Sequence, residues 1–593
     1  MKEKPENFTP GIHNSDYENE YLQSRLTASQ LVNITGRRTE SLNGKWRFAA
    51  DLYDTCRRQG WFRQGRLNAE GRELPLDFDW ESLEQITVPS SWNLLKPELY
   101  YFEGFGVYTR TFRYFAQEEG ERLLLRFEGA AYRTTVFLNG KIAGTHDGAS
   151  TPFNADITDI VNRGDNRIVV SVDARRSPLR LPMENTDWFN YGGIYRDIYL
   201  VRLPPVYIKD WFVRLDSSAI SADVYIENTK DGQLNANLRM EIPGLNICND
   251  IPVINGKAKI KIPASPQLWS PENPKLYDVT FTLDANAHSD TVNDRIGFRI
   301  IEAKGQEIFL NGKKIFLKGV CVHEDHITLG KTTTEKIIRK TIRDLKEMNG
   351  MYLRLAHYPH DPRFARIADE EGVLLWEEIP VYWAIAFDNP DTYNDAENQL
   401  AELILRDRNR ASVIIWSIGN ENADTDSRLS FMSRLAEKAK ALDESRLVSA
   451  ACLIKHEKLK IEDRLIDHLD VIGINEYYGW YDPDFDKLPK MLEISNPEKP
   501  VVICEFGGDA RLGHRGTAEE LWTEDKQKHI YEKQVETFKK CPYIAGITPW
   551  ILYDFRCPRR FNRYQEGFNR KGLIDADRKS KKPAFYVMQE FYS

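Results

Sequence analysis

The sequence predicts a multidomain protein of class β plus α/β, with two antiparallel β-sandwiches followed by a C-terminal (β/α)8 barrel. The 593 residues are too many for a single hydrophobic core. Short segments of alternating apolar residues fill the first half of the chain. From about residue 301 the period changes, and strand-like and helix-like segments alternate. We therefore predict domains at residues 1–204, 205–300 and 301–593.

The two sandwiches are predicted from runs of short strands. The segments RLLLRFEGA, TTVFLNGKIAG, NRIVVSVDA and RDIYLVRL place apolar residues mostly on one face, and NGK at 139–141 is typical of a hairpin turn. Leu203-Pro204-Pro205 then interrupts the pattern, as a linker would. The second β run, from about Val206 to Phe298, has the length of an immunoglobulin-like sandwich, about 95 residues.

The third domain is predicted as eight strands separated by helices. Thr332 or Thr334 can cap the first helix, and Asp361 and Gly372 mark the start and end of the second. Eight such units are what a (β/α)8 barrel requires. A doubly wound sheet is the alternative, but no Gly-rich phosphate loop follows the first strand. The predicted strands are Ile315–Val320, Met351–Leu355, Val373–Trp376, Val413–Trp416, Arg446–Ala450, Val471–Ile474, Val501–Cys504 and Ile544–Trp550.

Composition narrows the class of protein. The net charge is −8, and no long basic run or zinc-finger spacing occurs, so we predict no nucleic-acid partner. The seven scattered cysteines include no CxxC, which argues against a disulfide framework and a structural zinc site. No run approaches the ~20 apolar residues of a membrane span. We expect a soluble chain without a membrane partner. Cytoplasm and periplasm both stay open, because a leader could have been removed, and so does assembly into a homo-oligomer.

Two glutamates stand at the ends of predicted barrel strands, where active-site groups of such barrels lie. Glu421 follows SVIIWSIGN on the fourth strand, and Glu505 follows VVIC on the seventh. Two carboxylates about 5–5.5 Å apart suit a retaining glycosidase, in which one is the nucleophile and the other the acid/base. Asn420 could then hydrogen-bond a sugar hydroxyl. The alternative is that each glutamate forms a structural ion pair at its strand end.

Histidines also follow the first two predicted strands. His323 opens the segment HEDH, and His357 follows MYLRLA. The segment lacks the helical pair of histidines, four residues apart, of a metalloprotease motif. We therefore predict no metal and no cofactor. The histidines are expected either to donate to sugar hydroxyls and orient carboxylates or to be structural.

Eight motifs are spread along nearly the whole chain: SLNGKWRF, VPSSWN, TPFNADIT, FNYGGIYR, VHED, LAHYP, WSIGNEN and VICEFG. Together they resemble glycoside hydrolase family 2. The resemblance implies a sugar-binding-like jelly roll for the first sandwich, an immunoglobulin-like second sandwich and a catalytic barrel. It also implies that Glu421 is the acid/base and Glu505 the nucleophile.

Two further segments, NEYYGWY and FNRKGLI, are most similar to the β-glucuronidase branch of that family. An Asn-x-Lys signature of this branch, which reads the substrate carboxylate, corresponds to Asn569 and Lys571. An amide and an ammonium two residues apart on an extended loop point to the same side and can reach one carboxylate. A neutral galactoside is expected to leave Lys571 unpaired. The alternative is that NRKGLIDADRKSKKP is a solvated basic tail.

The resemblance implies further sugar contacts, and one departure leaves the sugar open. Gln565 stands four residues before Asn569, where some glucuronidases place an Arg toward the carboxylate, so galacturonate remains an alternative to glucuronate. The segment after EEIPVYW reaches the next helix quickly, which predicts a more open site. The Arg-rich insert Arg556–Gly567 either contacts an acidic substrate or is exposed. The other implied contacts are Asp156, His323, Asn475, Tyr477, Tyr481 and Trp550.

The predicted function is an exo-acting retaining glycoside hydrolase that removes terminal β-linked glucuronic acid by double displacement. Its partner would be a glucuronide or an oligosaccharide that contains uronic acid. A β-galacturonidase or a β-galactosidase of the same family is the alternative. A non-catalytic carbohydrate-binding protein is an alternative of another class, but it is expected to have lost one carboxylate, and both are present.

Overall fold

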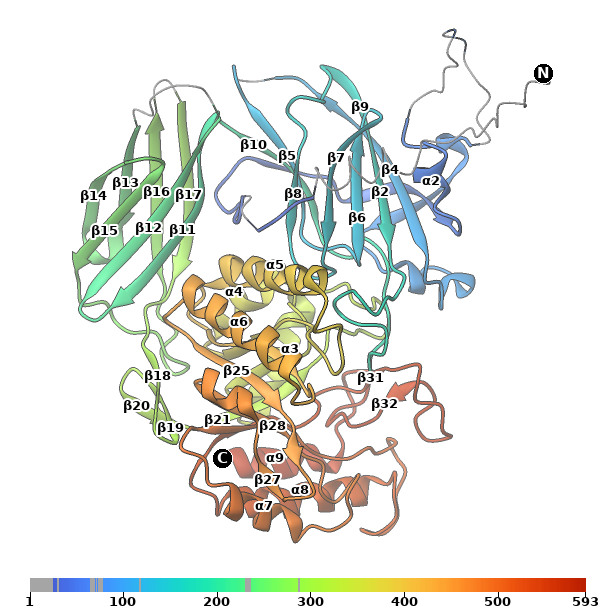
Figure 1. Cartoon of the computed structure of the whole chain (residues 1–593), viewed down its shortest axis with the longest axis vertical. Coiled ribbons are helices and arrows are strands. Elements are labelled where there is room, and N and C mark those ends of the chain that lie inside the picture. The colour runs from blue at the N-terminus through green and yellow to red at the C-terminus, as the bar shows by residue number, and fades with distance from the viewer. Residues whose placement is uncertain are drawn as a thin grey trace, which may run out of the picture. The chain divides into compact units, whose positions relative to one another are not determined.

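The computed structural model describes residues 25–28, 31–63, 70, 72, 78–116, 119–229, 236–285 and 288–593. The chain divides into two compact units (Figure 1). The first holds Met1–Gln30, Arg37–Arg175 and Asn190–Pro205, and the second holds Leu31–Gly36, Arg176–Phe189 and Val206–Ser593. The segment Arg176–Phe189 therefore belongs to the same unit as the C-terminal residues. The domain bounds 1–204, 205–300 and 301–593 stay a prediction.

The first unit is an antiparallel β-sandwich, as predicted. Its described strands form a sheet of order β1-β10-β5-β8 and a sheet of order β3-β2-β4-β9-β6-β7. Asn139 and Gly140, both with positive φ, make the turn of the β6–β7 hairpin, which confirms the predicted NGK turn. The bounds are β1 Thr39–Ser41, β2 Gly44–Asp51, β3 Glu84–Val88, β4 Phe105–Tyr114, β5 Arg122–Phe127, β6 Arg133–Leu138, β7 Lys141–Asp147, β8 Phe153–Asp156, β9 Gly164–Asp173 and β10 Ile198–Leu203, with one short helix, α2 Thr55–Arg58.

Within the second unit, residues 206–296 form the predicted immunoglobulin-like sandwich. Among its described residues, one sheet has the order β11-β12-β15 and the other β14-β13-β16-β17. Every second side chain of β16 is buried, among them Val279, Phe281 and Leu283, because one face of the strand packs on the opposite sheet. The bounds are β11 Val206–Asp216, β12 Ala219–Asn228, β13 Ala236–Ile242, β14 Ile247–Pro252, β15 Lys257–Pro263, β16 Tyr277–Ala285 and β17 His288–Ile296.

Residues 317–547 hold a closed parallel barrel, which confirms the (β/α)8 prediction and excludes the doubly wound sheet. Each predicted strand is present with small shifts in its ends. The first begins at Leu317 rather than Ile315, and the last ends at Ile547 rather than Trp550. The strands, in barrel order, are β21 Leu317–Val322, β22 Tyr352–Leu355, β23 Leu374–Glu378, β24 Val413–Asn420, β25 Leu447–Cys452, β28 Val471–Asn475, β29 Val501–Glu505 and β30 Ile544–Ile547.

A small antiparallel sheet that the sequence analysis did not predict precedes the barrel. It consists of β18 Ile301–Lys304, β19 Glu307–Leu310 and β20 Lys313–Ile315. Its side chains Ile308 and Leu310 join a core cluster with Leu317 and Tyr352 at the amino ends of barrel strands. This sheet therefore packs at the end of the barrel opposite the strand ends that carry the predicted site, and it explains why β21 starts late.

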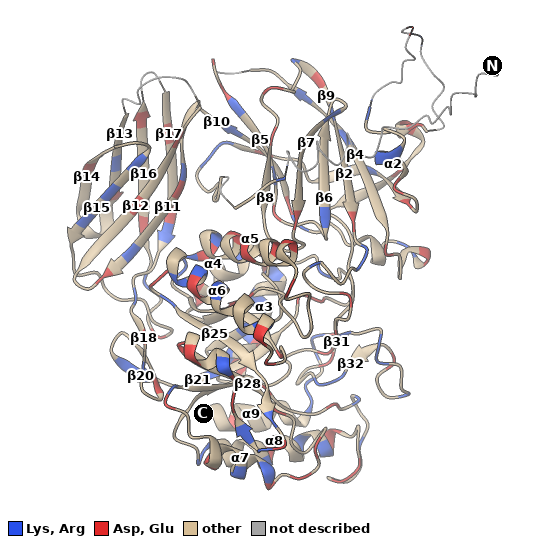
Figure 2. Ribbon diagram, in the orientation of Figure 1, with Lys and Arg blue, Asp and Glu red and all other residues tan. Residues whose placement is uncertain are grey.

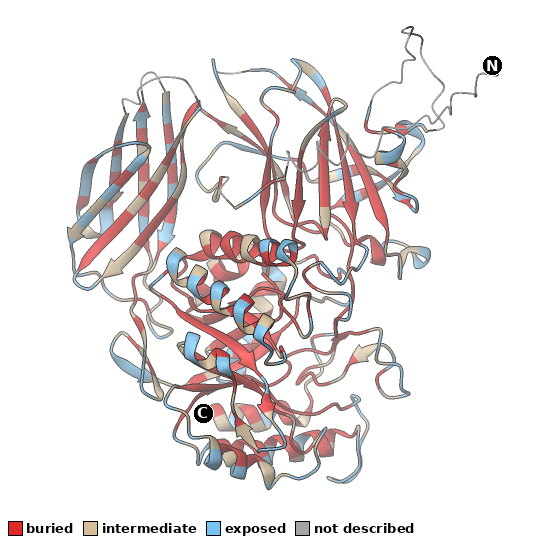
Figure 3. Cartoon of the chain, in the orientation of Figure 1, coloured by how far each residue is buried: buried red, intermediate tan, exposed pale blue. Residues whose placement is uncertain are grey.

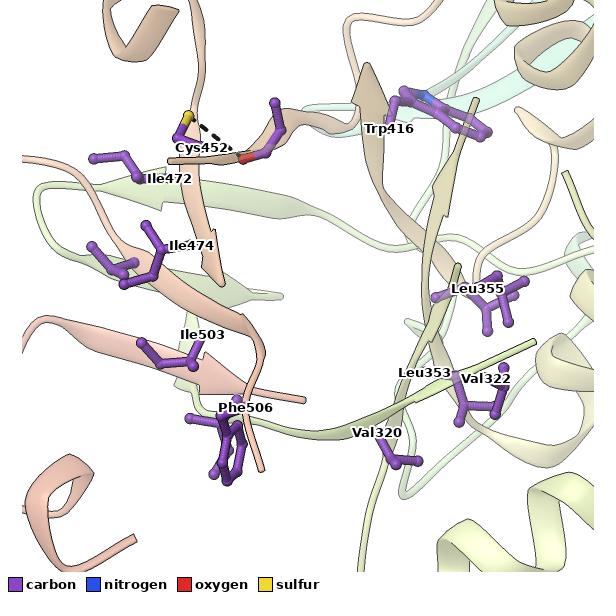
Figure 4. Packing of buried hydrophobic residues seen from close by; sticks show 14 of the residues in the cluster. Val320, Val322, Leu353, Leu355, Trp416, Cys452, Ile472, Ile474, Ile503 and Phe506 are labelled. Carbon is purple, nitrogen blue, oxygen red and sulfur yellow. Dashed lines mark hydrogen bonds between the residues drawn. The ribbon is translucent and has the colours of Figure 1, made fainter. Parts of the chain in front are cut away.

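The barrel strands are buried on both sides, and Figure 3 shows them red beneath helices whose outer faces are exposed. One face of the strands packs on the helices, with Val320, Leu353 and Ile472 among the side chains of that cluster (Figure 4). The other face fills the barrel with side chains such as Trp376 and Val502. The interior is therefore a packed core, which leaves the carboxyl ends of the strands for a site.

The helices begin and end at the predicted signals. Thr334, rather than Thr332, caps α3 by accepting a hydrogen bond from the Ile337 amide at 3.3 Å. Asp361 caps α4, and Gly372 ends it with a φ of 67°. The described part of the chain has no helix with the length and apolar character that crossing a membrane requires. The helices are α3 Glu335–Glu347, α4 Pro362–Glu371, α5 Pro390–Asp407, α6 Asp426–Leu442, α7 Lys487–Ser495, α8 Glu524–Phe538 and α9 Pro583–Tyr592, and the short hairpins pair β26 Ile454–Lys455 with β27 Lys460–Ile461 and β31 Phe555–Arg556 with β32 Phe568–Asn569.

Candidate active site

Both predicted catalytic glutamates lie at carboxyl ends of barrel strands. Glu421 directly follows β24, and Glu505 is the last residue of β29. Glu421 has a φ of 53°, a left-handed conformation that non-glycine residues rarely adopt. Gly419 makes this turn of the chain possible, because a Cβ there would lie 2.6 Å from the side-chain oxygen of Asn422. The motif WSIGNEN thus directs the Glu421 side chain out of the strand.

The carboxylate of Glu421 is held by two neutral donors. Asn475 Nδ2 donates to Oε1 at 3.0 Å, and Trp383 Nε1 donates to Oε2 at 2.7 Å. Burial raises the pKa of Glu421 above its ordinary value, and the nearby charge of Glu505 raises it further, while the two donors act in the opposite direction. A carboxyl group with a raised pKa beside a second carboxylate has the environment of a general acid.

Glu505 also has a donor on each carboxylate oxygen, and it is only 5% exposed. Arg354 Nη1 donates to Oε1, and the Tyr477 hydroxyl donates to Oε2, both at 2.7 Å. Asn475 is the strand partner of Glu505 in the β28–β29 pair. The side chains of Asn475 and Tyr477 therefore link the two glutamates along one edge of the barrel.

Arg354 connects the site from inside the barrel, and the sequence analysis missed it. Its guanidinium donates to Glu378 Oε1 at 3.1 Å and to Asn420 Oδ1 at 2.8 Å, besides Glu505. Burial favours the neutral acid, but Arg354 and a hydrogen bond from His357 lower the pKa of Glu378 to about 2. A charged residue inside the apolar strand YLRL was the available signal, because a buried arginine needs carboxylate partners.

In the side-chain amide of Asn420, the oxygen has hydrogen-bond partners among the described residues and the nitrogen has none. Its Oδ1 accepts from Arg354 and, at 3.2 Å, from Asn475. Its Nδ2 is buried and meets no hydrogen-bond partner among the described residues. A buried amide donor without a partner is costly. This donor therefore suits a substrate hydroxyl, as the sequence analysis expects.

Aromatic rings surround His323 and His357. The ring of Trp550 stacks on His357 at a centroid distance of 4.9 Å and meets His323 edge-on at 5.2 Å. His323 Nδ1 lies 3.1 Å from the Tyr358 hydroxyl, and its buried Nε2 has no partner in the described part of the chain. Burial lowers the pKa of His323 well below its ordinary value, so the ring is neutral.

The rest of the HEDH segment has structural contacts. Glu324 accepts a hydrogen bond from the Asp361 amide at 2.6 Å, at the start of α4. Asp325 pairs with Arg556 at 2.8 Å. Each carboxylate of the segment therefore holds a neighbouring loop in place.

Lys571 and Asn569 lie in the interior, so the reading of this segment as a solvated tail is wrong for both residues. Lys571 is 1% exposed and Asn569 is fully buried. Lys571 Nζ lies 2.6 Å from Asp509 Oδ2 and 3.1 Å from the Tyr481 hydroxyl. Burial disfavours the ammonium, yet Asp509 raises the pKa of Lys571 above its ordinary value. The expectation that a neutral sugar leaves Lys571 unpaired is also wrong, because Asp509 is its partner.

Lys571, Asp509 and Tyr481 belong to a second group of residues, which adjoins the two glutamates. Lys571 Nζ lies 5.6 Å from the ring centroid of Tyr477, whose hydroxyl binds Glu505. The rings of Tyr477 and Tyr481 meet edge-on at 5.3 Å. Tyr477 therefore lies between the Lys571 ammonium and the Glu505 carboxylate, and it contacts both.

The sequence analysis missed Asp187 and left the Arg-rich insert, which includes Arg560, as either a substrate contact or an exposed segment. Arg560, from the Arg-rich insert, lies 2.5 Å from Asp187 Oδ2 and donates to the Tyr481 hydroxyl at 3.4 Å. Asn569 Nδ2 donates to the same Asp187 oxygen at 3.4 Å. Gln565 donates to Oδ1 of Asp509 at 3.0 Å, the carboxylate whose other oxygen contacts Lys571. Figure 2 shows the basic residues around β31 and β32 that flank this insert.

Asp156 is a residue of the first unit. It is the last residue of β8 and forms an ion pair with Arg122 of β5. Its predicted contact with the sugar stays a prediction.

Comparisons with known proteins agree with this architecture. Residues 39–204 match the model of "Glycosyl hydrolases family 2, sugar binding domain", 206–299 that of "Glycosyl hydrolases family 2", and 301–593 that of "Glycosyl hydrolases family 2, TIM barrel domain". A β-glucuronidase of Sus scrofa is 27% identical over 616 residues, which cover 94% of this chain and 91% of the relative.

Two solved structures are similar along almost the whole chain. A GH2 β-galacturonidase from Eisenbergiella tayi bound to galacturonate is 27% identical, with a TM-score of 0.81 over 94% of this chain and 97% of that one. The β-glucuronidase of Ruminococcus gnavus is 25% identical, with a TM-score of 0.83 over 96% and 99%. Because the three family models together span nearly all of residues 39–593, the chain belongs to glycoside hydrolase family 2.

Proposed function

We propose that the protein is an exo-acting retaining β-glucuronidase, in which Glu505 is the nucleophile and Glu421 the acid/base. The observation that carries this proposal is the position of Lys571, a buried ammonium 5.6 Å from the ring of the tyrosine that binds Glu505. A fixed cation beside the reacting sugar favours a substrate with a carboxylate. The β-glucuronidases of Sus scrofa and Ruminococcus gnavus support the same sugar.

The reaction follows from the two carboxyl groups. In the first step Glu505 attacks the anomeric carbon while Glu421 gives its proton to the leaving oxygen. In the second step Glu421 takes a proton from water, which displaces Glu505 from the sugar. Arg354 and Tyr477 orient Glu505 through its two oxygens. Asn420 donates its unpartnered amide hydrogen to a hydroxyl of the bound sugar.

Other parts of the proposal rest on the sequence. We assign Asn475, Tyr481, His323, Trp550 and Asp156 to the binding of the same sugar. The domains at 1–204, 205–300 and 301–593 are its jelly roll, immunoglobulin-like sandwich and catalytic barrel. Assembly into a homo-oligomer is tested by light scattering: a mass above the 68.8 kDa of one chain supports it, and the mass of one chain overturns it.

A β-galacturonidase is the second candidate. The Eisenbergiella tayi relative favours it, and so does Gln565, whose amide is engaged with Asp509 where some glucuronidases have an arginine. The two sugars differ only in the orientation of one hydroxyl group. Both need Lys571, so the choice between them depends on the substrate assay.

The first experiment compares aryl β-glucuronide, β-galacturonide and β-galactoside. The variant Lys571→Met is expected to lower kcat/KM for the best uronide about 10- to 100-fold more than for the galactoside, because one charge-assisted hydrogen bond is lost. Lys579→Met is the control, since Lys579 is exposed in the same basic segment. A galactoside as the best substrate, together with no selective effect of Lys571→Met, contradicts the uronide assignment.

A second experiment separates an enzyme from a non-catalytic binding protein. A fluorinated aryl uronide is expected to accumulate as a covalent adduct on the peptide that contains Glu505, which mass spectrometry identifies. Neither turnover nor a labelled peptide, with any of the three sugars, would mean that the protein only binds carbohydrate.

A further inference from the structure

Trp383 is fixed beside the candidate acid/base. It lies in residues 379–389, the short segment that joins β23 to α5 and that the sequence analysis correctly expects to be brief. Its backbone amide donates to the Asn420 carbonyl at 2.9 Å, and its own carbonyl accepts from Asn422 Nδ2 at 2.6 Å. Its indole donates to Glu421 Oε2 at 2.7 Å. The chain therefore holds this ring against one oxygen of the Glu421 carboxylate.

Arg559 lies over the ring of Trp383. Its guanidinium carbon is 5.2 Å from the ring centroid, a distance at which the aromatic face attracts a cation. Nη1 donates to Asn185 Oδ1 at 3.1 Å, which anchors the end of the side chain. The side chain is nevertheless 45% exposed. An anchored guanidinium with an open side is preorganised for an anion from solution.

The charges around Arg559 are not balanced. Asp187 is the carboxylate between Arg559 and Arg560, and it contacts Arg560 at 2.5 Å but Arg559 only at 3.8 Å. Oδ2 of Asp187 thus contacts both Arg560 and Asn569. One carboxylate therefore serves two guanidinium groups, and Arg559 is the less engaged of the two.

The position of Arg559 relative to the reaction rests on the proposed roles. Glu421 delivers its proton to the oxygen of the leaving group, so a ring that binds Glu421 Oε2 borders that group. The group proposed for the uronate carboxylate is Lys571, which lies on the ring of Tyr477, and Tyr477 binds Glu505 rather than Glu421. We propose that Arg559, which lies over the ring of Trp383, forms a subsite for the leaving group. This subsite selects anionic aglycones, such as a sugar or aryl group that bears a carboxylate or a sulfate.

The test compares charged and neutral leaving groups on the same sugar. The substrates are 3-carboxy-4-nitrophenyl β-glucuronide, its neutral methyl ester and the 3-sulfo analogue, and the measured quantity is the ratio of kcat/KM for the anion to that for the ester. Dividing the ratio of a variant by that of the wild type removes the intrinsic reactivity of the leaving group. Comparison of the two anions distinguishes a site for carboxylates from one for sulfo groups.

Arg559→Gln is expected to lower this ratio about 10-fold, the loss of one charge-assisted hydrogen bond. Arg563→Gln is the matched control in the same insert: its guanidinium lies on Tyr564 in an exposed position, and the ratio should stay as in the wild type. High salt should also reduce the ratio in the wild type, because the site is partly exposed. An unchanged ratio in Arg559→Gln, or an equal fall in Arg563→Gln, overturns the subsite.

The experiment can reject the proposed subsite and the proposed sugar independently of each other. If the wild-type enzyme hydrolyses the galacturonides instead, the glucuronidase assignment falls. The same three leaving groups on galacturonate then give the ratio, and the subsite is judged on that sugar. If charged and neutral glucuronides are hydrolysed with the same ratio in all variants, the assignment of the sugar stands and the subsite is wrong.

Discussion

Glu421 has opposing influences on its protonation. Burial and the charge of Glu505 raise its pKa, whereas the hydrogen bonds from Asn475 and Trp383 stabilise the carboxylate form. The balance suits a group that must be an acid in the first step and a base in the second. Residue substitutions that remove one donor therefore change the pH dependence in a predictable direction.

Trp383→Phe removes the indole donor and is expected to raise the pKa of Glu421. The first step needs the protonated acid, so the alkaline limb of the kcat/KM profile should move to higher pH. Trp416→Phe is the control, because the Trp416 indole donates to Asp443, away from the site. An alkaline limb at the wild-type position in Trp383→Phe, with only a lower rate, would show that Trp383 does not tune the acid.

The two glutamates should differ in their response to the leaving group. Glu421→Gln is expected to lower kcat about 10²- to 10⁴-fold for a poor leaving group and much less for a nitrophenol, which needs little protonation. Glu505→Gln should abolish turnover for both, because no glycosyl intermediate can form. Steady-state rates on a series of aryl glycosides measure this difference. Equal losses in the two variants across the series contradict the assigned roles.

At the scale of residues, the sequence analysis found the groups that stand just beyond apolar strands. Glu421, Glu505, Asn420 and Asn475 follow this pattern, and the structure brings them together. It missed Arg354, whose role depends on partners in three other strands. Periodicity reports which face of a strand is buried, but it does not report which charge lies across the barrel.

Among the elements, helix ends followed the sequence most directly, because their signals are local. Thr334, Asp361 and Gly372 each act at the predicted position. The sheet β18–β19–β20 was missed, since three-residue and four-residue strands carry too little periodicity. Because β20 includes Ile315, β21 begins two residues later than the predicted first strand.

Gly372→Ala tests how strictly the end of α4 is determined. Gly372 has a φ of 67°, and an added Cβ would lie 2.4 Å from the Pro271 carbonyl oxygen. Gly312 has a φ of 76° with nothing within 4 Å of the added Cβ. Both alanine variants should lose about 1 kcal/mol from the left-handed conformation. Gly372→Ala should lose clearly more, seen as the lower Tm. Equal Tm values would mean that Pro271 moves aside without cost.

At the scale of the whole second unit, buried ion pairs join the immunoglobulin-like sandwich to the barrel. Asp294 of β17 binds Arg410, which follows α5 and also lies 3.3 Å from Asp369. Asn409 donates to the Trp211 carbonyl at 3.0 Å in the same region. The contacts of Asp294 with Arg410 and of Trp211 with Asn409 connect residues that are 116 and 198 positions apart in the chain. The helices around the barrel carry charges of both signs on their exposed faces (Figure 2), where pairing contributes little.

Asp294→Asn should destabilise the second unit, because it leaves Arg410 with Asp369 as its remaining carboxylate in a buried place. Loss of a buried partner costs about 3 kcal/mol, which differential scanning calorimetry would record as a lower Tm. Asp278→Asn on the neighbouring strand is the control, since its side chain is 82% exposed and lies 4.0 Å from Arg295. A Tm for Asp294→Asn as high as that of the control would show that the pair does not hold the sandwich to the barrel.

The sequence by itself determined the class of fold, the eight-strand barrel and the identity of the strand-end glutamates. These follow from local periodicity and from motifs whose residues are close in the chain. Tertiary structure alone decided that Lys571 pairs with Asp509, that Arg354 joins Glu378 to Glu505, and that Trp383 binds Glu421. The physical reason is that such partners are selected by the packing of loops and strands far apart in sequence, and burial, which makes these contacts strong, exists only once the barrel has closed.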